Sequence, residues 1–185
     1  MTTQTNVVTP ERFAKGLGYK EWLSKLDINV DKFDKNYAEF QLKPEDTKFF
    51  IDASKKPNGP AKILALGEGW CPDVIRGMPM IAKLAEQTGL ELRTFFRDQN
   101  LDIMNQFLFK GEFQSIPVFV FYTKDLKYIC HWIERAESTV AEYAEVRAKL
   151  GADRSKFGEI TMPRWEHYRQ ESIREMKELI SKHVA

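Results

Sequence analysis

The pattern of apolar and polar positions changes near residue 57. Before that point apolar residues recur every three or four positions, as at Phe13 and Leu17, which predicts several short helices over residues 10–56. The stretch 55–60 contains two prolines and a glycine and breaks this pattern. We therefore place the start of the main domain at residue 57.

After residue 57, apolar runs of strand length alternate with helical stripes. The run 61–66 is almost wholly apolar, which is typical of a strand covered on both faces. Further strands are predicted over 90–96, 117–122 and 127–133, and helices over 72–88, 101–110 and 138–150. Parallel strands joined by crossover helices, followed by a hairpin, predict an α/β fold in three layers with a mixed central sheet.

The predicted organisation has three parts. Residues 1–56 form an N-terminal helical extension, 57–151 the α/β domain, and 152–185 a C-terminal helical extension that packs on the same domain. The last helix is predicted to begin near Pro163. We interpret the aromatic residues of both extensions as part of one core; the alternatives are an exposed partner surface and a homodimer built through the terminal helices.

The charge balance excludes some classes of partner. The chain has 28 basic and 27 acidic side chains, a formal net charge of +1, so no strong field favours nucleic acid or an anionic membrane. Residues 1–9 are polar and lack the apolar core of a signal peptide, and the longest apolar runs are well short of the roughly 20 residues that cross a bilayer. With two cysteines far apart in sequence, we expect a reduced, cytoplasmic protein.

Cys71 is the residue with the clearest chemical potential. It stands between Trp70 and Pro72, where a buried strand ends and a helix begins. Unpaired N–H groups and the helix dipole favour a thiolate there, and Pro72 suits the first helical position. The Asp73 carboxylate acts in the opposite direction, so the sequence leaves the direction of the pKa shift open. The alternative for Cys71 is a buried structural thiol.

Several motifs, in the right order, resemble the thioredoxin superfamily. These are Trp70-Cys71, Pro79 inside the following helix, the polar turn 97–100, and Ser-Ile-Pro at 115–117. The likeness is closer to a bacterial branch with a Trp-Cys-Gly-Asp-Cys type of motif, which shares the Arg-Asp-x-Asn-Leu-Asp pattern of residues 97–102. The resemblance implies a thioredoxin-like fold and a role in thiol–disulfide exchange.

The resemblance also implies roles for individual residues. Cys71 becomes the nucleophile, and Pro117 becomes the cis-proline of a loop that lies against the substrate. For Arg97 and Arg135 the alternative is a solvated surface arginine; near the thiol, either could stabilise a thiolate or bind a carboxylate. The expected substrate-binding residues are Trp70, Pro72, Asp73, Arg97, Ile116, Pro117 and Arg135.

Two positions depart from the family pattern. Val74 occupies the position of the second, resolving cysteine, and Ala65 that of a buried aspartate. Cys71 can therefore form a mixed disulfide but cannot release it internally. We interpret the chain as a monothiol redox protein whose partners are proteins or small thiols and disulfides. The alternative is an interaction module that kept the fold and lost turnover.

The remaining chemistry-bearing residues add little to this interpretation. Cys130 is expected in the core, and Glu68 is expected to be a plain loop residue, with a role as proton acceptor for Cys71 as the alternative. The three histidines, at 131, 167 and 183, lack zinc-ligand spacing with the cysteines, and no Gly-rich phosphate loop is present. We expect neither a metal nor a cofactor.

Overall fold

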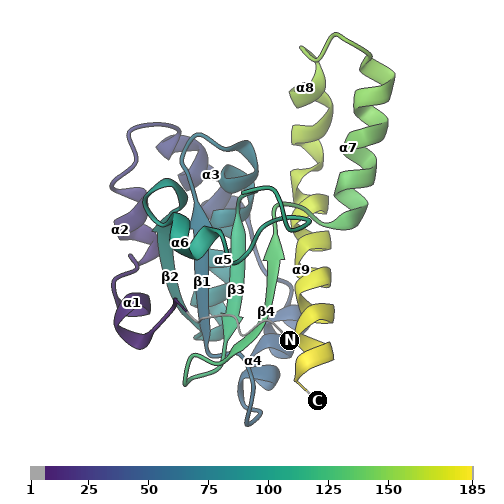
Figure 1. Ribbon diagram of the computed structural model, residues 1–185. Helices are drawn as coiled ribbons and strands as arrows, with labels where there is room; N and C mark the ends of the chain where they lie inside the picture. The colour runs from purple at the N-terminus through teal and green to yellow at the C-terminus, as the bar shows by residue number, and fades with distance from the viewer. Residues whose placement is uncertain (1–6, 185) are drawn as a thin grey trace.

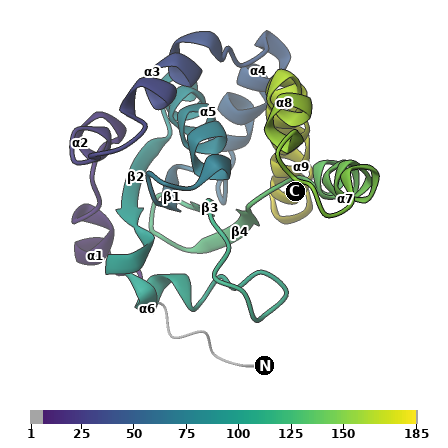
Figure 2. The same cartoon turned by 90° about the horizontal axis from the view of Figure 1, so that it is seen from above.

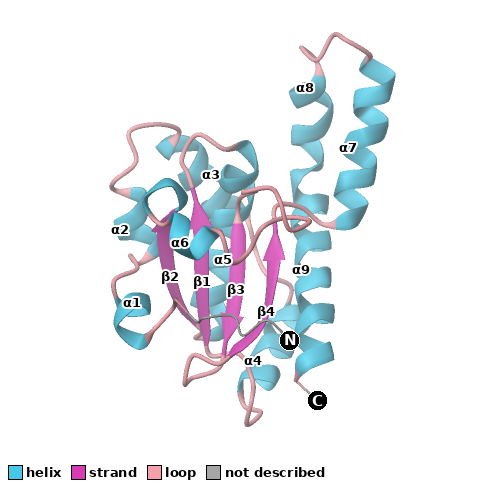
Figure 3. Ribbon diagram, viewed as in Figure 1, coloured by secondary structure: helices cyan, strands magenta, loops and turns pink. Residues whose placement is uncertain are grey.

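A mixed sheet of four strands forms the centre of the protein. The computed structural model describes residues 7–184; residues 1–6 and 185, which belong to the two expected extensions, lie outside the described residues. The strands are β1 (Lys62–Gly67), β2 (Glu91–Phe96), β3 (Val118–Tyr122) and β4 (Tyr128–Ile133), in the order β2-β1-β3-β4 (Figure 3). β1 pairs with β2 in parallel, and β3 is antiparallel to both β1 and β4. The predicted mixed α/β sheet is confirmed.

Helices cover the sheet because its central strands are apolar on both faces. Every residue of β3 is buried, and Leu64 and Leu66 of β1 are fully enclosed. One face is covered by α3 (Val30–Glu39), α4 (Pro44–Ser54) and α5 (Pro72–Thr88), and the short α6 (Leu101–Met104) lies over the other face (Figures 1 and 2).

The terminal helices complete the two edges of the sheet. Next to β2 lie α1 (Pro10–Ala14) and α2 (Tyr19–Leu23), and along β4 lies α9 (Trp165–His183) (Figure 1). Before α9, α7 (Glu137–Leu150) and α8 (Phe157–Thr161) form an antiparallel hairpin that rises beyond the carboxyl end of β1 (Figure 1). Cys71 lies just after β1, so this hairpin stands at the same end of the molecule as the candidate thiol.

One predicted helix is shorter in the structure, and one short helix, α8, was not predicted. The helix expected over 101–110 ends at Met104; the remainder of the segment forms turns instead, in which Lys110 and Gly111 have positive φ and Phe109 pairs with Phe113. The last helix begins at Trp165, after a 3₁₀ turn and the unpredicted α8. Across residues 7–184, no helix combines the length and the apolar composition that crossing a bilayer requires.

Candidate functional site

Cys71 is the N-cap residue of α5. Its backbone is extended (φ −85°), and its carbonyl accepts the first helical hydrogen bond from the Ile75 N–H at 3.0 Å, while Pro72 occupies the first helical position. The Cys71 Sγ lies 3.7 Å from the carbonyl oxygen of Ile116, and the Ile116–Pro117 peptide bond is cis. The fold thus places the strand–helix junction that carries Cys71 next to the Ser-Ile-Pro loop.

Desolvation dominates the electrostatics of the thiol. Cys71 is 8% exposed, and burial raises the pKa of its thiol above the ordinary value. Hydrogen bonds from the Val74 and Asp73 N–H groups and the charge of Arg135 lower the pKa, whereas the Asp73 carboxylate raises it further. The helix N-terminus therefore acts as the sequence suggested, but it is outweighed, and the thiol is mainly protonated at neutral pH.

Asp73 is enclosed by two arginines. Its carboxylate pairs with Arg76 at 3.0 Å and accepts two hydrogen bonds from Arg135, of which Nε–Oδ1 is 3.1 Å. Arg76 is 2% exposed and donates to the Tyr143 hydroxyl at 3.0 Å. We did not predict Arg76 from the sequence, although an acid and a base three residues apart in an apolar helix are a recognisable pair.

A cavity of about 580 Å³ opens beside the thiol. We call it the Cys71 groove. Its near side consists of Trp70, Cys71, Pro72, Asp73, Ile75, Lys32 and Glu134, with Arg97, Gln114, Ser115, Ile116 and Arg135. The α7–α9 segment supplies its other side through Tyr143, Arg147, Phe157, Gly158, Thr161, Met162 and Trp165. The groove therefore has apolar and aromatic walls with several cationic groups at its surface.

Six of the seven predicted substrate-binding residues line this groove with Cys71: Trp70, Pro72, Asp73, Arg97, Ile116 and Arg135. Trp70 is 52% exposed, and the Arg97 guanidinium lies 5.3 Å from the centre of its ring. The exception is Pro117, whose ring faces Gly77 of α5, so that a Cβ at Gly77 would come within 3.0 Å of it. Val74 is fully buried.

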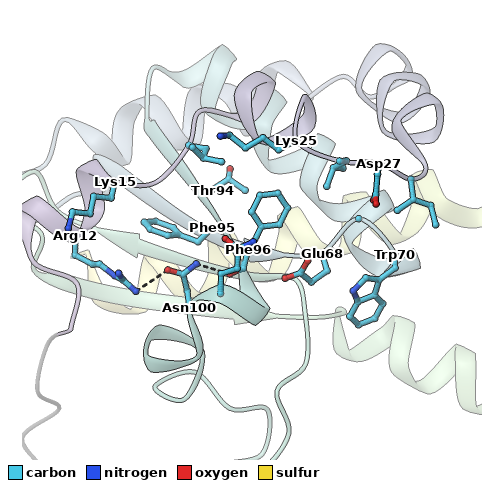
Figure 4. A pocket seen from close by; sticks show the side chains of 15 residues that line it. Arg12, Lys15, Lys25, Asp27, Glu68, Trp70, Thr94, Phe95, Phe96 and Asn100 are labelled. Atoms are coloured by element: carbon cyan, nitrogen blue, oxygen red, sulfur yellow. Dashed lines mark hydrogen bonds between the residues drawn. The ribbon is translucent and has the colours of Figure 1, made fainter.

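Glu68 lies on the other side of the turn that precedes Cys71. Its side chain accepts a hydrogen bond from the Asp98 N–H at 2.8 Å and lines a second cavity of about 640 Å³, together with Arg12, Lys15 and Lys25 (Figure 4). Burial raises the pKa of Glu68. Because Glu68 is not among the groove residues, its candidate role as proton acceptor for Cys71 has no support in the geometry.

The second cysteine is remote from this chemistry. Cys130 lies in β4 opposite Phe121, is 2% exposed, and burial raises its pKa to about 12. Both cysteines are free. Within residues 7–184 no group of three or more His, Cys, Asp or Glu side chains is arranged to hold a metal ion.

A comparison with known protein families agrees with the observed fold, thiol position and proline loop. A family model described as Thioredoxin matches residues 16–147, which is well over half of the chain. The chain belongs to the thioredoxin family. This family match includes α2 to α6 and most of α7, whereas α8 and α9, which complete the groove, follow it in the sequence.

Two solved structures share the fold of this thioredoxin-family chain. One is the protein of unknown function PA1234 from Pseudomonas aeruginosa, with a TM-score of 0.68 and 13% identity over 95% of this chain and 98% of that one. The other is an HIV epitope scaffold, with a TM-score of 0.69 and 16% identity over 95% and 99% of the two chains. No curated protein matches the chain. At these identities the likeness concerns the fold alone.

Proposed function

We propose that this thioredoxin-family protein performs monothiol thiol–disulfide exchange through Cys71. The observation that supports this best is the position of the Cys71 Sγ, at the N-cap of α5, 3.7 Å from the Ile116 carbonyl and at the wall of the groove. The other groove residues supply a surface for a disulfide-bearing partner, either a protein or a small molecule. The reaction needs no cofactor, and a reduced, cytoplasmic compartment would suit it.

The proposed reaction has two exchange steps. The Cys71 thiolate attacks one sulfur of a disulfide; a Cys71–substrate bond forms, the substrate S–S bond breaks, and the leaving sulfur departs as a thiolate that takes up a proton. An external small-molecule or protein thiolate then attacks the mixed disulfide and releases Cys71. The second thiol must come from outside because the resolving position holds Val74, which is fully buried.

Mixed-disulfide formation tests the proposal directly. In a Cys130→Ala background, the protein is incubated with bis(2-hydroxyethyl) disulfide between about pH 6 and 10, and adducts are followed by intact mass. We expect one adduct, whose rate of formation rises with pH through a pKa above that of a free cysteine, as the burial of Cys71 requires. A further Cys71→Ser substitution should abolish it. Absence of an adduct throughout this pH range would refute the proposal.

A second candidate is a non-catalytic binding module with the same fold. Two observations favour it: burial raises the pKa of the Cys71 thiol, and Val74 replaces the second thiol. In that case a Cys71→Ser variant would retain full binding of its partner, and a Cys71 thiol would trap no partner covalently. Monothiol exchange predicts the opposite result in both measurements.

A further inference from the structure

We propose that the Cys71 groove selects disulfides that carry negative charge, and that Lys32 and Arg147 recognise this charge. The inference rests on the proposed exchange function and names its substrate class. Its basis is the charge that remains in the groove once the ion pairs are assigned. The two residues come from separate elements, α3 and α7, and both line the same cavity.

The carboxylates of the groove are already committed to arginines. Asp73 is paired with Arg76 and Arg135, and Glu134 is paired with Arg135 at 2.5 Å. These four side chains form a neutral cluster, of which Asp73, Glu134 and Arg135 line the groove. They leave no free carboxylate there to compensate a further cation or to repel an incoming anion.

Arg147 is a cation without an acidic partner. Among residues 7–184 no carboxylate forms an ion pair with it; its guanidinium instead lies 5.3 Å from the ring centre of Phe157 and 5.9 Å from that of Tyr143. An arginine held over two rings keeps its N–H donors at its edge, where they can bind a carboxylate. The aromatic contacts therefore position Arg147 in the groove without neutralising it.

Lys32 of α3 also lines the groove and is held by a neutral side chain. Its Nζ donates to the Asn29 Oδ1 at 2.7 Å, and the Asn29 amide donates to the Gly69 carbonyl at 3.0 Å, next to the turn that carries Trp70. No carboxylate within the described part of the chain pairs with Lys32. Arg97, the remaining cation, is bound by Asp98 at 2.7 Å. The uncompensated charge of the groove is thus carried by Lys32 and Arg147.

A series of three small disulfides tests the inference. Cystamine carries two ammonium groups, bis(2-hydroxyethyl) disulfide is neutral, and dithiodiglycolate carries two carboxylates. The rate of Cys71 adduct formation is measured for each in the Cys130→Ala background at low ionic strength. Each rate is divided by the rate of a free small-molecule thiol with the same disulfide, because the three leaving thiols differ in intrinsic reactivity. For these normalised rates we expect the order anionic, neutral, cationic, and a preference that shrinks as salt is added.

Substitutions at Arg147 assign the preference to the groove. Arg147→Glu should lower the ratio of anionic to neutral rates by roughly three- to tenfold, and Arg147→Lys should largely preserve it. Lys149→Glu is the matched control: it makes the same change in net charge on an exposed position of the same helix that does not line the groove. We expect this control to change the ratio by less than about twofold.

The outcomes separate this inference from the exchange function on which it rests. Reaction of Cys71 with the neutral disulfide but no preference for the anionic one would overturn the inference and leave the exchange function standing. An equal effect of Arg147→Glu and Lys149→Glu would also overturn it, because the preference would then reflect overall charge. Failure of Cys71 to react with any of the three would overturn both.

Discussion

The ion pairs of Asp73 allow stability and thiol reactivity to be separated by one substitution. Asp73→Asn removes a carboxylate that is 7% exposed and keeps the shape of the side chain. It leaves the Arg76 and Arg135 guanidinium groups, which the carboxylate now neutralises, in a largely buried place. The same change removes a negative charge that raises the pKa of the Cys71 thiol.

The size of the stability loss can be worked from the pairs that remain. Removing one partner of a buried ion pair costs about 3–5 kcal/mol, because the other charge is left without compensation. Here Arg135 keeps the Glu134 carboxylate and Arg76 keeps the Tyr143 hydroxyl. We therefore expect Asp73→Asn to lower the free energy of unfolding by about 2–4 kcal/mol, somewhat less than full loss of the pair.

Reactivity should change in the opposite sense to stability. Without the Asp73 carboxylate, the pKa of Cys71 falls, so alkylation by iodoacetamide at neutral pH becomes faster although the fold is weaker. Arg135→Gln is the matched variant: it also lowers stability, but it removes a charge that favours the thiolate, so alkylation becomes slower. Urea unfolding followed by tryptophan fluorescence and alkylation rate against pH measure the two quantities.

Two results would refute this reasoning. If Asp73→Asn and Arg135→Gln shift the pKa of Cys71 in the same direction, local charge does not control the thiol. If Asp73→Asn lowers the free energy of unfolding by less than about 0.5 kcal/mol, the carboxylate and its arginines do not form a buried compensated cluster.

Three further predictions concern single positions. Burial raises the Cys130 pKa from 9.0 to about 12, so the thiol loses its proton at a lower pH in the unfolded chain than in the folded one, and stability falls above about pH 9. Between pH 8 and 10 the free energy of unfolding should therefore drop by about 1 kcal/mol more in the native chain than in Cys130→Ala. Gly158→Ala should raise the melting temperature through helix propensity. Gly77→Ala crowds Pro117, so it should lower the melting temperature below that of the native chain, by the equivalent of about 1 kcal/mol or more. Val74→Cys should shorten the lifetime of a Cys71 mixed disulfide in the absence of added thiol, as measured by intact mass.

The sequence predicted those parts of the molecule that local pattern determines. The bounds of α5 agree with the predicted 72–88, because Pro72 suits its first turn and Gly89 adopts the left-handed conformation that ends it. The apolar runs likewise predicted the strands, because a strand covered on both faces is apolar along its length. The length of the helix beginning at Leu101 is overestimated from the sequence, because the turn at Lys110 and Gly111 does not interrupt the apolar periodicity.

The site could be predicted only where it is close to a motif. Six of the seven expected substrate-binding residues line the Cys71 groove, since the strand–helix junction and the proline loop are recognisable in sequence. The far wall, which includes Arg147 and Phe157, depends on how α7 and α8 pack against distant elements, and no local spacing encodes that. Glu68 is close to Cys71 in sequence, but the turn directs its side chain to the second cavity, which agrees with the expected loop residue and not with a proton acceptor for the thiol.

The burial of Cys71 and the free cations of the groove have complementary effects on the proposed exchange. A thiol whose pKa is raised reacts slowly with disulfides in general, because little of it is thiolate at neutral pH. When an anionic disulfide approaches, its charge would disfavour the thiolate further unless cations offset that charge. Lys32 and Arg147 are the groups free to do so, since the other groove cations are paired. A disulfide bound by these two residues is held near the thiol and is also electrostatically compensated, so selectivity arises from the groove and not from an unusually reactive sulfur.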